Sequence, residues 1–152
     1  MARETGTLSL LFRVSTRLCA LPLEHVVETM RPQPVERFAG APAFVMGVAV
    51  IRGDAVPVVD VAAVLAAADS AVSRFVTVRA GARRVALAVG AVVGIVSVPA
   101  GSPQAPPLLG EARAEAIAAL GTLDGELLCV LDSARMVPDS LWDALEAGGV
   151  RR

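Results

Sequence analysis

The chain of 152 residues contains no tyrosine, no lysine and a single tryptophan, Trp142. Aromatic residues make up only 3% of it, so the side chains on which proteins stack single-stranded bases are scarce. The formal net charge is −1, which gives no strong field to attract nucleic acid or acidic lipid. The composition therefore argues against a protein that binds nucleic acid.

Signals for export or membrane insertion are also missing. The N-terminal residues include the charged Arg3 and Glu4 in place of the apolar core of a signal peptide. The longest uncharged apolar runs, such as residues 85–96, fall short of the ~20 residues that a membrane-spanning helix needs. Cys19 and Cys129 each lie in an apolar run, as is typical of buried free thiols. We expect a cytoplasmic protein without direct membrane insertion.

Motifs for catalysis are absent as well. The sequence has no Gly-x-Ser-x-Gly nucleophile elbow, no phosphate-binding loop and no dinucleotide-binding glycine pattern. His25 is the only histidine, whereas a metal site needs three or four ligands. Asp54, Asp60, Asp124 and Asp132 fall at predicted turns or helix starts, where local hydrogen bonding explains them. We predict no enzyme activity, no catalytic residue, no cofactor and no metal.

What the chain has in excess is aliphatic surface. Apolar residues make up 55% of it and charged residues only 19%, whereas ordinary globular chains are roughly 45–50% apolar. In a soluble protein such a surplus indicates an apolar patch that a partner covers. The length suits one compact domain, or two small subdomains that share a core.

Short apolar runs separated by turn residues predict a mainly β chain. Gly81 and the Asp124–Gly125 pair are typical of hairpin turns, and Asp60 is a suitable N-cap for a short helix. The expected strands include residues 8–14, 18–21, 48–51, 55–59, 75–78, 84–89 and 127–131, with helices over residues 61–68 and 111–119. Short strands at this spacing favour β-barrels over a parallel α/β sheet.

The second half of the chain repeats the first. Residues 53–60 match residues 125–132 with equal Gly-to-Asp spacing, and residues 20–27 match residues 86–93. This repeat predicts two related small β-barrels, the first formed by residues 8–68 and the second by residues 73–137, followed by a helix over residues 139–147.

The repeat is broken at two charged positions. Glu28 corresponds to Gly94, and Arg52 corresponds to Asp124, so this acid and base occur together only in the first half. We therefore predict a specific polar feature in the first barrel. Two interpretations stay open and are compatible: an ion pair exposed at a docking surface, and an ion pair that fixes the hairpin.

The ordered set of motifs resembles the CheW-like domains of bacterial chemotaxis adaptors. Its most specific part is residues 52–60, an Arg-Gly turn followed by Val-Pro-Val-Val-Asp, and residues 42–47 and 20–23 add to it. The similarity extends over residues 8–145. It implies one CheW-like domain over residues 1–152, all-β with short helices, in which two SH3-like five-stranded β-barrels pack around a shared apolar seam.

The resemblance also implies a function without chemistry of its own. Such adaptors couple the cytoplasmic tip of a methyl-accepting chemoreceptor to a CheA-type histidine kinase, and a receptor helix would lie in the groove between the barrels. Glu28 and Arg52 match the charged pair of the family, and Val26 and Gly47 match positions associated with partner contact. With Gly53, these residues form the expected docking site.

Three departures from the family pattern leave the partners open. Val50 replaces the usual Asn, Ala86 replaces a frequent Gly, and Gly90 replaces the Asp of an Asp-x-Val motif. One alternative is a divergent adaptor of a non-motility chemosensory pathway that keeps one partner. Another is a small-ligand or regulatory module that uses the cleft between the barrels.

Overall fold

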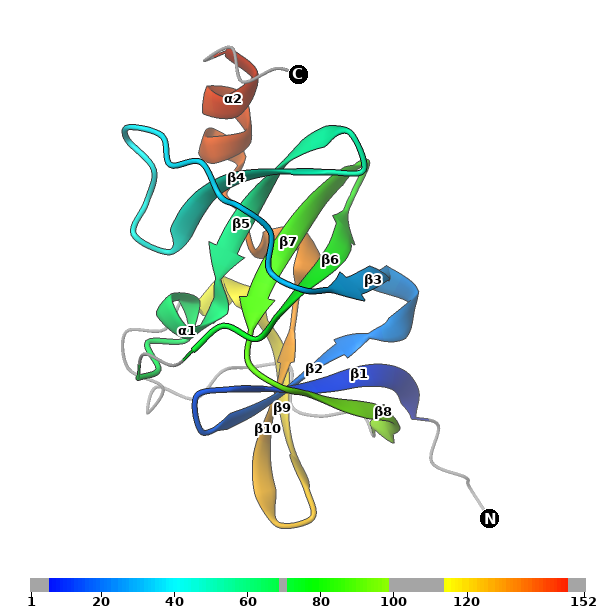
Figure 1. Cartoon of the computed structure of the whole chain (residues 1–152). Coiled ribbons are helices and arrows are strands. Elements are labelled where there is room, and N and C mark those ends of the chain that lie inside the picture. Colours follow the sequence, from blue (N-terminus) through cyan, green and yellow to red (C-terminus); the bar gives the residue numbers. More distant parts are fainter. Residues whose placement is uncertain (1–5, 69–70, 99–113, 148–152) are drawn as a thin grey trace.

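The computed structural model describes residues 6–68, 71–98 and 114–147. Within these residues, ten β-strands form two five-stranded sheets, which lie one above the other in Figure 1. No helix in this part of the chain is both long enough and apolar enough to cross a bilayer.

Sheet A has the strand order β8-β1-β2-β10-β9, and sheet B has the order β3-β6-β7-β5-β4. All neighbours are antiparallel except β2–β10 and β5–β7, which are parallel. The strands of sheet A are β1 (Thr7–Val14), β2 (Arg17–Pro22), β8 (Val92–Val98), β9 (Ile117–Leu123) and β10 (Glu126–Leu131). Those of sheet B are β3 (Val26–Met30), β4 (Val45–Ile51), β5 (Asp54–Asp60), β6 (Arg74–Ala80) and β7 (Arg83–Val89).

The helices are short and lie at the ends of strands. They are η1 (Leu23–His25), α1 (Val61–Val64), η3 (Ala114–Ala116), η4 (Ser133–Arg135) and α2 (Asp139–Ala147). The α1 helix is shorter than the expected 61–68 because Leu65 already leaves the helical conformation and Ala66 has φ 53°. Apolar Leu141, Trp142 and Leu145 of α2 are buried in the core.

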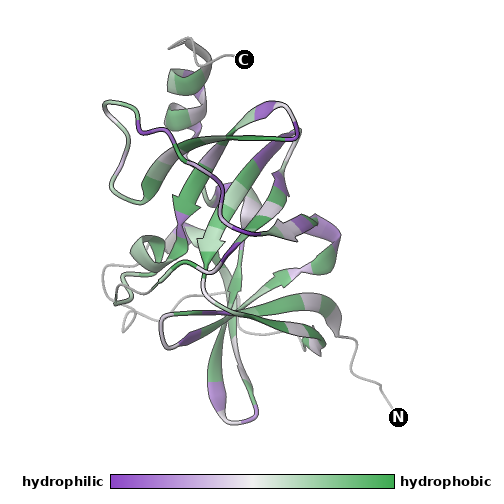
Figure 2. Cartoon of the chain, in the orientation of Figure 1, coloured by the Kyte–Doolittle hydropathy of each residue, from purple (hydrophilic) through white to green (hydrophobic). Residues whose placement is uncertain are grey.

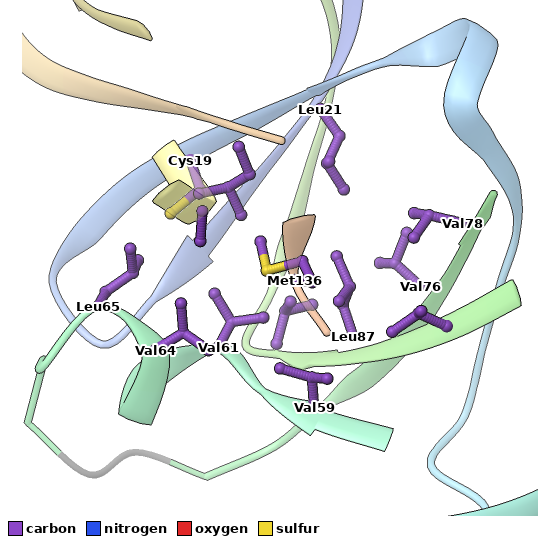
Figure 3. Close-up of a cluster of buried hydrophobic side chains, with 14 of the residues drawn as sticks. Cys19, Leu21, Val59, Val61, Val64, Leu65, Val76, Val78, Leu87 and Met136 are labelled. Carbon is purple, nitrogen blue, oxygen red and sulfur yellow. The ribbon is translucent and has the colours of Figure 1, made fainter. Parts of the chain in front are cut away.

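One large core joins the two sheets. Phe12 and Leu21 enter it from sheet A, and Val76 and Leu87 enter it from sheet B; Figure 3 shows part of this cluster. Figure 2 shows that the strands of both sheets are mostly hydrophobic, with hydrophilic residues mainly near the turns. We call this cluster the shared core. The expected apolar seam is therefore present, and its interior is filled by the protein's own side chains.

Each sheet also curls around a small core of its own on its other face. In sheet B this core holds Ala49, Ile51, Val56, Val58, Phe75, Ala86 and Ala88. In sheet A it holds Leu11, Leu18, Ala20, Val98 and Leu128. Strands buried on both faces read as continuous apolar runs, which explains sequences such as Val56–Val59. The small core of sheet B is the one that positions the candidate site.

The predicted all-β class with two five-stranded units is confirmed, with two corrections. Neither sheet is a closed barrel, because no ladder among the described strands joins its two edge strands. The units also do not follow the halves of the sequence: β1 and β2 pair with strands of the second half, and β6 and β7 pair with strands of the first. The bounds 8–68 and 73–137 are therefore wrong as descriptions of the two units.

The repeat itself is present in the strand registers. Val58 lies opposite Ala86 in sheet B, and its counterpart Val130 lies opposite Ala20 in sheet A. The caps also correspond, since Oδ1 of Asp60 accepts from the Ala62 amide at 3.1 Å and Oδ1 of Asp132 accepts from the Ala134 amide at 3.1 Å. The two halves have thus exchanged their first hairpins.

Candidate docking site

A bidentate ion pair connects the two edges of sheet B. Arg52 Nε donates to Glu28 Oε2 at 3.0 Å, and Arg52 Nη2 donates to Glu28 Oε1 at 2.7 Å. Glu28 lies on edge strand β3, whereas Arg52 lies in the turn that follows the opposite edge strand, β4. The bidentate geometry fixes the plane of the guanidinium group.

The turn that carries Arg52 has a strained backbone. Arg52 has φ 54° and Gly53 has φ 84°, which are the two positive φ angles of a type I′ hairpin turn. Gly53 adopts this conformation without penalty, because it has no Cβ. An arginine at the first position is uncommon, since side chains with a Cβ disfavour the left-handed region.

The ion pair stays charged at neutral pH. The hydrogen bond from Arg52 lowers the pKa of the Glu28 carboxyl below its ordinary value, and the positive charges of Arg52 and Arg84 act in the same direction. The same hydrogen bond raises the pKa of Arg52. The Arg52 side chain is 68% exposed and that of Glu28 is 25% exposed. So exposed a pair adds little stability, and orientation and recognition are its main effects.

The ion pair lies at one end of the small core of sheet B. Glu28 is opposite Thr77 in the ladder, two residues from Met30, which is opposite Phe75 of that core. Side chains two residues apart face the same side of a sheet. The hydroxyl of Thr77 also donates to the backbone oxygen of Glu28 at 3.3 Å. The pair therefore lies on the face of sheet B that carries the small core.

The structure brings three of the five predicted docking residues together: Glu28, Arg52 and Gly53. Val26, at the start of β3, is half-buried against the shared core, and a register shift between Val26 and Glu28 puts their side chains on opposite faces of sheet B. Glu28 in turn holds the Arg52–Gly53 turn. Gly47 lies five residues from Arg52, which is about 16 Å along a strand, and it belongs to a different contact.

Gly47 allows the chain to approach β4 closely. With φ 147°, a Cβ built at Gly47 would lie 2.2 Å from the backbone oxygen of Glu36. Glu36 and Val48 form a β-bridge there, with N···O distances of 2.8 and 2.9 Å. Gly47 thus holds residues 35–36 against the edge of β4.

A second ion pair, not expected from the sequence, joins two strands of sheet A. Arg13 on β1 and Glu126 on β10 form two hydrogen bonds, one of them 3.0 Å from Arg13 Nη2 to Glu126 Oε1. The expectation that only the first half contributes such a feature is therefore wrong. Arg13 and Glu126 are not at the repeat positions of Arg52 and Glu28, so aligning the halves cannot find them.

An exposed apolar patch lies at the surface of the seam. Leu8 is 57% exposed, Val93 is 56% exposed and Ile95 is 55% exposed. They lie on the paired strands β1 and β8, with Ser97 opposite Leu8 and Leu10 opposite Ile95. We call these three residues the seam patch. A hollow lined by Leu8, Leu23 and neighbouring residues adjoins it.

Other hollows lie outside the seam. Two of them, of about 430 and 470 Å³, flank the β4–β5 hairpin and share Val48 and Ala55 in their lining. A ligand cleft inside the seam is not observed among the described residues, because the shared core occupies that space. In the described part of the chain, no group of three or more His, Cys, Asp or Glu side chains is placed to hold a metal ion.

Two sheets that share a core and present a fixed ion pair and an apolar patch define a protein-binding scaffold. The family model of the CheW-like domain matches residues 9–140, so the chain belongs to the CheW-like domain family. Members of this family are non-enzymatic chemotaxis scaffolds, in agreement with the function expected from the sequence.

The fold is similar to that of a solved scaffold. The scaffolding protein TtCheW from Thermoanaerobacter tengcongensis superposes with a TM-score of 0.73 at 17% sequence identity, covering 88% of this chain and 98% of that one. At this identity the similarity shows a shared fold. No curated protein matches the chain.

Proposed function

We propose that this protein is a cytoplasmic adaptor that couples the cytoplasmic tip of a chemoreceptor to a CheA-type histidine kinase. The family supports a chemotaxis scaffold. The observation that carries the proposal is the Glu28–Arg52 pair, in which the exposed guanidinium is held in one orientation by both carboxylate oxygens. An adaptor that serves a non-motility chemosensory pathway would use the same contacts with its kinase and receptor.

The kinase binds, in this proposal, at the end of sheet B. Glu28 uses Nε and Nη2 of Arg52, and Nη1 makes no hydrogen bond within the described residues. Nη1 is therefore available to a carbonyl or carboxylate oxygen of the partner. Gly53, next to Arg52 in the turn, completes the contact. Val26 contributes indirectly, by anchoring the start of β3 to the shared core on the opposite face. Gly47 contributes indirectly, by fixing residues 35–36 on the edge of the same sheet.

The receptor helix binds, in this proposal, on the seam patch. Its three side chains are apolar and more than half exposed, and β8 contains no charged residue. An amphipathic helix buries its apolar face in such a surface. The interior of the seam is filled, so the helix lies across the strands and does not enter between the sheets.

A charge swap separates recognition from structure. The proteins to compare are wild type, Arg52→Glu, Glu28→Arg and the double variant that carries both changes. We expect each single change to weaken binding of the kinase regulatory domain at least tenfold, measured by isothermal titration calorimetry. The double variant should recover the ion pair and the melting temperature of wild type, yet not its affinity, because the partner meets the opposite charge.

The control is Arg74→Glu, which changes the net charge equally at the first residue of β6, where, among the described residues, Arg74 donates only to the Ser73 carbonyl. It should bind like wild type. Recovery of full affinity in the double variant would show that the pair is structural only, and wild-type affinity in both single variants would refute the docking role of Arg52.

A further inference from the structure

Two arginines lie directly opposite each other beside the ion pair. Arg79 on β6 is the ladder partner of Arg84 on β7, and both are exposed. Like charges at directly opposite positions destabilise a sheet. Arg84 is two residues from Ala86 of the small core, so its side chain is on the same face of sheet B as that core. This is also the face that carries Glu28. An arrangement that costs stability in the free protein suggests a ligand that relieves it.

The charge of Arg84 is not matched within the described residues. Arg79 donates from Nη1 to the backbone oxygen of Glu24 at 3.0 Å, whereas Arg84 has no hydrogen bond or ion pair in this part of the chain. Arg84 is near enough to Glu28 for its charge to lower the pKa of that carboxyl. Both oxygens of Glu28 are already bonded to Arg52, which leaves the Arg84 guanidinium free.

The surroundings of Arg84 leave a local excess of positive charge. Asp54 lines the same hollow as Arg84, but no ion pair joins them. This end of sheet B thus holds three guanidinium groups, those of Arg52, Arg79 and Arg84, against the carboxylates of Glu28 and Asp54. The carboxylate of the neighbouring Glu24 contacts His25 and not one of these arginines. The chain as a whole has a net charge of −1, so the excess is a feature of this surface.

We propose that Arg84 and Arg79 form a docking site for an acidic side chain of the partner protein, next to the Glu28–Arg52 pair. The inference rests on the proposed function, because it assigns a chemistry to the partner of that site. A guanidinium group binds a carboxylate through two parallel hydrogen bonds. Glu28 and Asp54 would repel a continuous phosphate backbone, which favours a protein segment with isolated Asp or Glu residues.

The first test uses hexaglutamate as the probe and needs no cognate partner. In NMR spectra of the full chain, we expect saturable shifts of the Arg84 and Arg79 Nε–H signals and of neighbouring β6 and β7 amides. These shifts should be lost in Arg84→Gln and kept in Arg74→Gln. Equal shifts at Arg74 and Arg84 would overturn the proposal, as would stronger binding of a DNA duplex at the same residues.

The second test measures binding of the kinase regulatory domain and of the receptor tip. Arg84→Glu should weaken binding of the kinase regulatory domain, the partner proposed for this end of sheet B, about tenfold or more and reduce its salt dependence. It should leave binding of the receptor tip unchanged, and Arg74→Glu should affect neither protein. The melting temperature of the Arg84→Glu variant should equal or exceed that of wild type, because the like-charge contact between Arg79 and Arg84 is removed. Unchanged kinase binding by Arg84→Glu would overturn the inference and leave the proposed function standing. If wild type binds neither protein, the proposed function fails, and the NMR titration with hexaglutamate then tests the inference by itself.

Discussion

Arg52 occupies a backbone conformation that its residue type disfavours. Its repeat counterpart, Asp124, has φ 52° and is followed by Gly125 with φ 79°, so both hairpins have the same turn. Aspartate is enriched in the left-handed region and arginine is not. A residue held against its local preference suggests a functional requirement, here the reach of the guanidinium group to Glu28.

The two ion pairs predict how stability depends on pH. Hydrogen bonds from Arg52 and Arg13 lower the pKa values of Glu28 and Glu126 below 4.5, the ordinary value. The stabilisation from a carboxyl with a lowered pKa is present above the unfolded-state pKa and is lost as the pH falls through the folded-state pKa. The unfolding free energy of wild type, measured with urea, should therefore fall more steeply below about pH 4.5 than that of the Glu28→Gln/Glu126→Gln variant. Equal pH dependence would contradict this account.

At the residue scale, part of the site is predictable from sequence. Glu28 and Arg52 are identified because they interrupt a repeat. Arg84 and Glu126 are not, since the chain carries fourteen arginines and fifteen acidic residues and only the strand order shows which of them meet. A guanidinium group without a partner is visible only in three dimensions.

At the scale of the elements, the apolar pattern predicts the strands, whereas the helices expected from alanine-rich segments do not form at their full length. The expected helix over residues 111–119 lies partly outside the described residues. Within them the chain forms η3 and then enters β9 at Ile117. Alanine favours a helix locally, but pairing with β10 and burial of Ile117 and Leu120 outweigh that preference.

The edge of β4 depends on the absence of a side chain at Gly47. Gly47→Ala places a Cβ against the Glu36 backbone, so we expect a loss of about 2 kcal/mol or more in unfolding free energy from the clash and the positive φ. The matched control is Gly53→Ala, where φ is 84° and nothing lies within 4 Å. It should cost only about 1 kcal/mol, which is the cost of placing a Cβ in the left-handed region. Equal losses in urea unfolding would show that the close approach to Glu36 has no energetic weight.

The exchange of hairpins decides the architecture of the whole molecule. Segment boundaries and the repeat are readable from the sequence, but the partner of each hairpin is not. The first hairpins of the two halves have the same apolar pattern, so the sequence does not show whether each hairpin pairs with strands of its own half or of the other half. The exchange places strands of both halves in each sheet, with the shared core between the sheets.

Because one core joins the sheets, we expect the molecule to unfold as one unit. Leu21 of sheet A and Leu87 of sheet B are repeat counterparts and are both 0% exposed in that core. Leu21→Ala and Leu87→Ala should each cost about 2–5 kcal/mol and shift a single urea transition seen by circular dichroism. Separate transitions for the two sheets, detected by hydrogen exchange, would contradict a common core.

At the scale of the assembly, the central claim is that one chain holds two proteins at once, one at the end of sheet B and one on the seam patch. The most direct test is the mass of the complex formed with the kinase regulatory domain and the receptor tip, measured by light scattering after size-exclusion chromatography. The account predicts a ternary complex that loses the kinase domain in Arg52→Glu and the receptor tip in Ile95→Glu. Competition between the two proteins for one surface, or binding of neither, would contradict it.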